Sequence, residues 1–99
     1  MKSLLQKLRL SEVNAGASTG QDRWIDEPNG IKLVSYNPTT GDRIADVVMA
    51  SAATYDQVVA EAQDAFTTWR TMPAPRRGLL VRDLGNALRE YIEPLGEMV

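Results

Sequence analysis

The sequence predicts an α+β fold in which a β-hairpin is followed by two amphipathic helices. Two short runs of β-branched and aromatic residues flank a turn-forming segment, and two longer apolar stripes at helical spacing come after them. The length of 99 residues suits one small domain at most. We divide the chain into a leader helix and loop over residues 1–24, a hairpin over residues 25–50, and a helical part over residues 51–99.

The leader contains a short amphipathic helical turn and a polar loop. Leucines and basic residues are interspersed over residues 3–10, which indicates a helix with one apolar side. The next segment, SEVNAGASTGQD, is rich in Gly, Ser, Asn and Asp, and we therefore expect a loop there.

The hairpin prediction rests on two strand-like runs and the turn between them. The runs are Ile31–Tyr36 and Arg43–Met49, and the segment NPTTGD between them supplies the turn formers Pro38 and Gly41. An isolated hairpin is at best marginally stable in water. We therefore expect this one to pack on a helix or to join a larger sheet.

Two amphipathic helices are predicted after the hairpin. Ser51 and Thr54 are alternative N-caps for the first, the latter with Gln57 in the capping-box position. Its apolar stripe consists of Tyr55, Val59, Ala62, Phe66 and Trp69. The segment TMPAP ends this helix and begins the next, and Pro94 should interrupt or restart the second helix near Glu93. The stripe of the second helix consists of Leu80, Val81, Leu84, Ala87, Leu88, Tyr91 and Leu95.

Composition excludes several classes of function. The chain has no Cys and no His, which removes thiolate nucleophiles, imidazole bases and the common zinc ligands from it. Its net charge of −2 argues against nucleic acid as a partner. The N-terminus lacks the uninterrupted apolar run of a secretory signal, and no run is long enough for a membrane span. We therefore expect no membrane contact and a cytoplasmic location.

The charged residues give no convincing reactive site. Arg82 and Arg89 share a polar face with acidic residues and are interpreted as solvated. Arg76 and Arg77 stand at a helix N-terminus, where a cation opposes the helix dipole. These two are either simply exposed or paired with a carboxylate of another domain or subunit. The carboxylates at positions 26 and 27, or at 42 and 46, lack a neighbouring nucleophile, and we do not assign catalysis to them.

Gly78 and Gly85 lie seven residues apart on the flank of the second stripe. Each disfavours a helix interior by about 0.5–1 kcal/mol relative to Ala, a cost that is easier to tolerate where another element approaches the backbone closely. No phosphate-binding glycine pattern is present, so we expect close packing here rather than ligand binding.

Several motifs together resemble the N-terminal segment of the aldehyde dehydrogenase superfamily. They are YNPTTGDRIADV, a helix with the pattern AxxxFxxW, and PAPRRGLLVRDLGNALREYIEPLGEMV. The last string is similar to the branch that includes α-aminoadipic semialdehyde dehydrogenase (antiquitin) and the piperidine-6-carboxylate dehydrogenases. Leader residues match this branch as well: Leu5, Leu8, Leu10, Glu12, Asn14, Gly16, Gly20 and Trp24. Arg9 and Pro94 depart from it, since the branch often has Gly at the first position and usually no proline near the second.

The resemblance implies an NAD(P)-dependent enzyme that oxidises an aldehyde to a carboxylate through a cysteine thioester. It places the catalytic cysteine, glutamate and asparagine and the cofactor loop in a later part of such enzymes. We therefore carry over no catalytic, cofactor-binding or metal-binding residue, and expect no cofactor for these 99 residues alone. On this reading the chain is an inactive fragment whose helices pack on a Rossmann-like cofactor domain. Its partners are then the rest of the parent chain or other subunits, with a small aldehyde as the parent's substrate.

A second hypothesis remains open from the residues themselves. Two amphipathic helices and a hairpin also suit a small, self-contained α+β module that binds a protein partner and has no catalytic role. Cooperative unfolding of the 99 residues that does not depend on concentration would favour this module.

Overall fold

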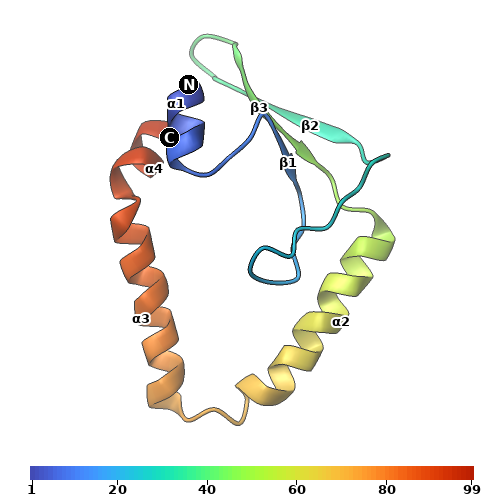
Figure 1. Ribbon diagram of the computed structural model, residues 1–99, viewed down its shortest axis with the longest axis vertical. Helices are drawn as coiled ribbons and strands as arrows, with labels where there is room; N and C mark the ends of the chain where they lie inside the picture. Colours follow the sequence, from blue (N-terminus) through green and yellow to red (C-terminus); the bar gives the residue numbers. More distant parts are fainter. The chain divides into compact units, whose positions relative to one another are not determined.

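The computed structural model describes residues 1–99 and confirms the α+β class. Contacts divide the chain into two compact units. The sheet unit consists of residues 11–64, and the helical unit consists of residues 1–10 together with residues 65–99. In chain order the elements are α1 (Lys2–Lys7), β1 (Val13–Ala15), β2 (Lys32–Tyr36), β3 (Arg43–Val48), α2 (Ala52–Trp69), α3 (Ala74–Glu90) and α4 (Ile92–Met98) (Figure 1).

The sheet unit is built on a three-stranded sheet with the order β1-β3-β2. Strands β2 and β3 form the predicted hairpin, antiparallel and paired from Lys32 opposite Val48 to Tyr36 opposite Arg43. Strand β1 lies along the other edge of β3 and runs parallel to it (Figure 1). The hairpin therefore joins a larger sheet, as its marginal stability in isolation requires.

The prediction of a loop throughout SEVNAGASTGQD is wrong for Val13–Ala15, which form β1. This strand forms because it pairs with β3 residues that lie more than thirty positions later in the sequence. Local composition gives no indication of such pairing. Gly16 follows the strand in close contact with β3. A Cβ atom at this position would lie 2.1 Å from the Val48 carbonyl oxygen, so only glycine permits the approach.

The hairpin turn is organised by Asn37. Its Oδ1 accepts a hydrogen bond from the Thr39 amide at 2.8 Å, and its carbonyl oxygen accepts one from the Gly41 amide at 2.8 Å. Gly41 has a φ of 78°, in the left-handed region that favours glycine. At the start of β3 the pairing of the hairpin carries an irregularity, because Tyr36 pairs with Arg43 while Ser35 pairs with Ala45. Ile44 is therefore the extra residue of a β-bulge.

The boundary between α2 and α3 lies in the segment TMPAP, as the sequence predicted. The backbone amides of Thr71 and Met72 close the end of α2 with hydrogen bonds to Thr68 and Trp69. Pro73 is the N-cap of α3, and Pro75 occupies its first turn. The predicted restart near Pro94 is confirmed: α3 ends at Glu90, Tyr91 interrupts the helix, and α4 contains Pro94 in its first turn.

In the helical unit α1 lies beside α4 (Figure 1). Leu4 and Leu5 of α1 are buried. The helix ends in a Schellman motif, in which the Leu10 amide donates to the Leu5 carbonyl at 2.8 Å and the Arg9 amide to Gln6 at 3.0 Å. Arg9 has a φ of 57° and thus occupies the left-handed position where glycine is normally found.

Most of the apolar surface of the chain is exposed. No large side chain is fully buried, and the buried apolar residues are Leu4, Leu5 and Ala45. Both helical stripes are open: Tyr55, Val59 and Phe66 on α2, and Leu80, Val81, Leu84 and Leu88 on α3, are all at least 47% exposed.

Candidate functional site

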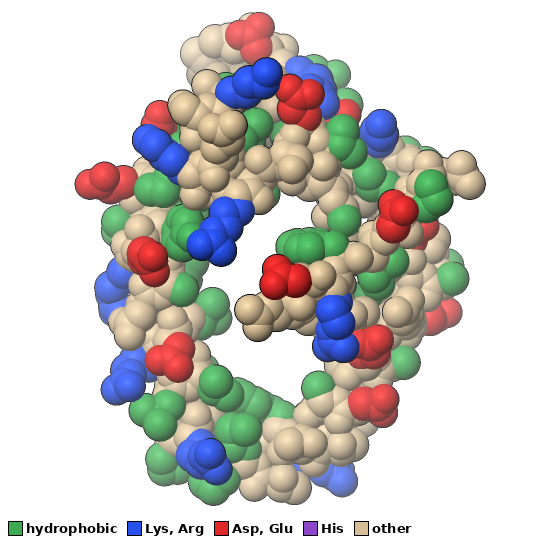
Figure 2. Space-filling model, in the orientation of Figure 1, with side chains coloured by type: hydrophobic (Ala, Val, Ile, Leu, Met, Phe, Trp, Pro, Cys, Tyr) green, Lys and Arg blue, Asp and Glu red, His purple; other side chains and the backbone are tan.

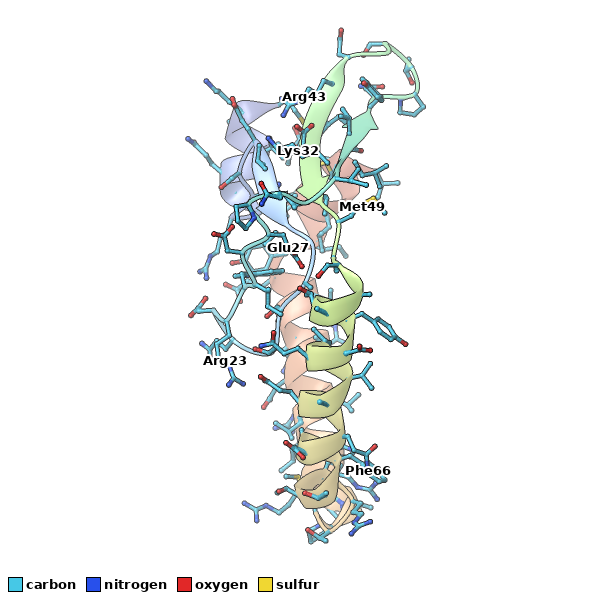
Figure 3. The ribbon with its side chains drawn as sticks, turned by 90° about the vertical axis from the view of Figure 1, so that its right-hand side faces the viewer. Arg23, Glu27, Lys32, Arg43, Met49 and Phe66 are labelled. Atoms are coloured by element: carbon cyan, nitrogen blue, oxygen red, sulfur yellow. The ribbon has the colours of Figure 1, made fainter.

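A network of hydroxyl groups and one carboxylate joins the segment before β2 to the start of α2. Glu27 Oε1 accepts hydrogen bonds from the Ser51 amide at 3.1 Å, from Ser51 Oγ at 2.8 Å and from Thr54 Oγ1. Ser51 Oγ in turn accepts from the Thr54 amide at 3.2 Å. Figure 3 shows Glu27 next to the first turn of α2. Ser51 is therefore the N-cap, and Thr54 serves as the partner of Glu27 instead.

The network favours the ionised state of Glu27. The hydrogen bond from Thr54, followed by those from the Ser51 amide and hydroxyl, lowers the pKa of Glu27, and burial opposes this effect. A carboxylate at a helix N-terminus is also favoured by the helix dipole. A lowered pKa makes Glu27 a weaker base, and three donors converge on its Oε1, so the arrangement is that of a structural cap.

A second carboxylate, Asp46, is buried on the central strand and paired with Arg43. The Arg43 Nε lies 2.8 Å from Asp46 Oδ1, and Arg43 also donates from Nη2 to the Glu12 carbonyl at 3.2 Å. The hydrogen bond from Arg43 lowers the pKa of Asp46, against the opposing effect of burial, and the same bond raises the pKa of Arg43. This pair connects β3 to the residue before β1.

The structure assigns structural contacts to two of the four carboxylates considered from the sequence. Glu27 caps α2, and Asp46 pairs with Arg43. Asp26 and Asp42 are exposed. The resemblance marked Asn14 in the sequence but gave it no contact; its side chain donates to the carbonyls of Ser11 at 2.8 Å and Asp46 at 3.3 Å and so holds β1 against β3. The Asn-x-Gly pattern before a long loop is the signal that could have indicated this contact.

The arginines of α3 do not form a basic ridge. Figure 2 shows basic and acidic side chains interspersed along this helix. Arg89 donates to Asn86 at 2.9 Å on its own helix, and Arg82 is exposed. Arg77 differs from these residues, because its Nε is buried and has no hydrogen-bond partner.

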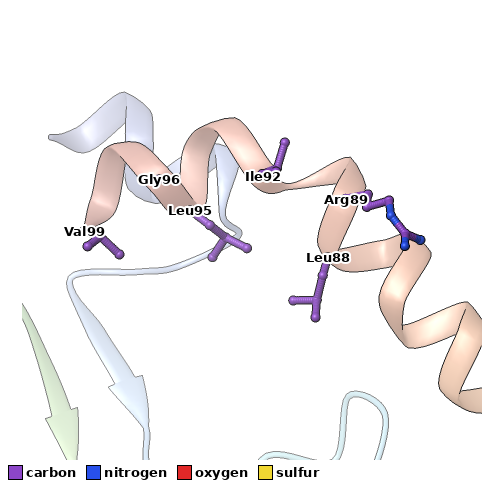
Figure 4. Close-up of a pocket in the computed structure, with 6 residues that line it drawn as sticks. All are labelled: Leu88, Arg89, Ile92, Leu95, Gly96 and Val99. Carbon is purple, nitrogen blue, oxygen red and sulfur yellow. The ribbon is translucent and has the colours of Figure 1, made fainter.

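The close packing expected at Gly78 and Gly85 is not provided by residues 1–99. A Cβ atom at Gly78 would have no neighbour within 4 Å, and one at Gly85 would meet only Arg89, at 3.9 Å. An open apolar hollow of about 380 Å³ lies farther along, where α3 meets α4 (Figure 4). Its lining consists of Leu88, Arg89, Ile92, Leu95, Gly96 and Val99.

Residues able to bind a metal do not cluster: no group of three or more acidic side chains is placed to hold an ion. No helix has the length and apolarity that crossing a membrane requires.

Comparison with known proteins identifies the family. The model of the "Aldehyde dehydrogenase family" matches residues 24–99, about three quarters of the chain. The chain belongs to the aldehyde dehydrogenase family. The resemblance inferred from its motifs is thereby confirmed, and it extends to particular relatives.

Several curated aldehyde and semialdehyde dehydrogenases align with most of the chain. "Alpha-aminoadipic semialdehyde dehydrogenase" of Bos taurus is 40% identical over 95 residues, which cover 96% of this chain and 17% of that protein. "Aldehyde dehydrogenase family 7 member A1" of Pisum sativum is 38% identical over 95 residues, covering 96% of this chain and 18% of that protein. "Malonate-semialdehyde dehydrogenase 2" of Geobacillus thermodenitrificans is 34% identical over 77 residues, which cover 78% of this chain and 16% of that protein. The chain therefore spans less than a fifth of the length of these curated relatives.

Proposed function

We propose that this chain is the N-terminal structural segment of an NAD(P)-dependent aldehyde dehydrogenase that oxidises a semialdehyde to a carboxylate, and that the segment has no activity by itself. The observation that carries the proposal is the family match over residues 24–99, together with relatives whose names specify semialdehydes. The intact enzyme would use NAD or NADP as its cofactor and act in the cytoplasm.

The chemistry of the side chains supports an inactive segment. Thioester formation needs a cysteine nucleophile, and this chain contains none. Its two best-placed carboxylates, Glu27 and Asp46, are held by Ser51, Thr54 and Arg43 in structural contacts. Neither carboxylate is available to activate a nucleophile.

The apolar faces support a packing role. An exposed stripe such as Leu80, Val81, Leu84 and Leu88 is unusual on the surface of a complete soluble domain. Each of these side chains contributes about 1.5–3 kcal/mol when it is fully buried. We propose that the stripe packs on the cofactor-binding domain of the same enzyme, and that other subunits are further partners.

An activity assay tests this proposal. The 99-residue chain and the longer protein that contains it are each supplied with α-aminoadipic semialdehyde and with NAD or NADP, and formation of the reduced nicotinamide is followed. We expect turnover by the longer protein and none by the 99 residues. Turnover by the 99 residues would overturn the structural assignment, and an inactive longer protein that binds no nicotinamide would overturn the enzyme assignment.

A further inference from the structure

Arg77 lies at the N-terminal end of the apolar stripe of α3. Helical geometry places the residues three, four, seven and eleven positions after it on the same face, and these are Leu80, Val81, Leu84 and Leu88. The other arginines of the helix point elsewhere, since Arg76, Arg82 and Arg89 are displaced by about 100–140° around its axis. A guanidinium thus stands on the same face as a row of hydrocarbon side chains, at its N-terminal end.

No ion pair is found for Arg77 within the helical unit. Its side chain is half-buried, and its Nε is buried without a hydrogen-bond partner. The first turn of α3 contains no acidic residue. The ion pairs between Arg23 and Glu61 and between Arg43 and Asp46 do not involve Arg77.

This position is unfavourable for a cation unless an anion accompanies it. The N-terminal end of the helix dipole repels positive charge, and a buried N–H without an acceptor is destabilising because its hydrogen bonds to water are lost. Covering the stripe would remove more water from the guanidinium. A charged side chain in such a place is almost always paired, and a carboxylate gives Arg two parallel hydrogen bonds.

We propose that an acidic side chain in the remainder of the same polypeptide pairs with Arg77 on the surface that covers the α3 stripe. This inference rests on the proposed function, in which that stripe packs on the rest of the enzyme. The partner is assigned to the same polypeptide because these residues correspond to less than a fifth of the length of the relatives, so most of the chain that could cover α3 is its own.

Three variants of the intact protein test the ion pair. Arg77→Met keeps an unbranched apolar stem and removes the charge, Arg77→Lys keeps the charge, and Arg76→Met is the control on a neighbouring face. We expect Arg77→Met to lower the Tm by about 5 °C, because a buried carboxylate is left without its partner. Arg77→Lys should lie between wild type and Arg77→Met, and Arg76→Met should match wild type. An Arg77→Lys variant that falls as far as Arg77→Met would overturn the proposal.

A fourth variant separates this inference from the proposed function. Leu84→Asp places a charge in the stripe without touching Arg77 and should prevent packing on the rest of the enzyme. If Leu84→Asp is strongly destabilising while Arg77→Met is not, the packing role stands and the ion pair is refuted. If neither variant changes the Tm, the packing role itself is refuted.

A structure of the intact protein should show a carboxylate oxygen of the same polypeptide at the Arg77 guanidinium, and a carboxylate from another subunit would contradict the assignment.

Discussion

Arg43 and Asp46 stand three residues apart on one strand and form an ion pair, with Arg43 Nε 2.8 Å from Asp46 Oδ1. Side chains three apart on a regular strand point to opposite faces of the sheet. The bulge at Ile44 inserts one extra residue between them and brings both side chains to the same face. The irregularity in the hairpin thus lets Arg43 contact both Asp46 and the Glu12 carbonyl before β1.

Asp46→Asn should lower the Tm of the protein by a few degrees at pH 7, whereas the exposed Asp42→Asn should leave it unchanged. The pKa of Asp46 is lowered in the folded state, so its contribution to stability is full above the unfolded pKa of about 3.9 and is lost as pH falls through the folded value. Thermal unfolding over a pH series measures both effects. The difference between wild type and Asp46→Asn should narrow below about pH 4, and a difference that widened there would contradict this account.

Ser51→Ala should destabilise the protein by about 1 kcal/mol, because it removes the hydroxyl that accepts from the Thr54 amide. The matched control is Gln57→Ala, which would matter only if Thr54 were the N-cap. We expect Gln57→Ala to change the free energy of unfolding by less than about 0.5 kcal/mol. Chemical denaturation of both variants decides the point, and a larger effect at Gln57 would restore the alternative cap.

The carboxyl group of Glu27 should titrate below the ordinary glutamate range in the folded protein. Thr54→Val removes the hydrogen bond that contributes most to this shift and nearly keeps the side-chain volume, so it should raise the pKa of Glu27. A carbon-detected NMR titration of the side-chain carboxyl measures both values. A pKa of Glu27 that is the same in wild type and in Thr54→Val would show that the hydroxyl does not act on the carboxylate.

Arg9→Gly should stabilise the protein by about 1 kcal/mol. Arg9 occupies the left-handed position of the Schellman motif, which disfavours side chains with a Cβ atom by about 1–2 kcal/mol, and part of the gain is offset because glycine loses more freedom on folding. The control is Lys7→Gly within α1, which should destabilise by a similar amount. Equal destabilisation by the two glycines in denaturant unfolding would rule out the strained conformation at Arg9.

The elements with local signals could be predicted from the sequence. Asn37, Pro38 and Gly41 specify the hairpin turn through their own backbone preferences, and Pro73 and Pro75 fix the boundary between α2 and α3. Strand β1 could not be predicted, because a run of three residues has little β-propensity. The residues with which it pairs are on β3, more than thirty positions later in the sequence. The resemblance had marked Asn14, Gly16 and Gly20, and the structure supplies physical reasons for the first two.

The side-chain contacts were less accessible than the fold. The sequence alone could not decide whether Ser51 or Thr54 is the N-cap. The answer depends on Glu27, which lies in the segment before β2 and accepts hydrogen bonds from both hydroxyl groups. The pairing of Arg43 with Asp46 depends on the β-bulge, and no pattern in the amino-acid composition of the strand indicates that bulge. Arg77 could be placed on the apolar stripe by counting, whereas the burial of its Nε appears only in three dimensions.

The central claim is that α3 is a packing face for the rest of an aldehyde dehydrogenase. Amide hydrogen exchange over Ala74–Glu90, measured in the isolated 99 residues and in the longer protein that contains them, tests it most directly. The account predicts that these amides exchange about a hundredfold more slowly, or slower still, in the longer protein. Equal exchange rates in the two proteins would contradict it.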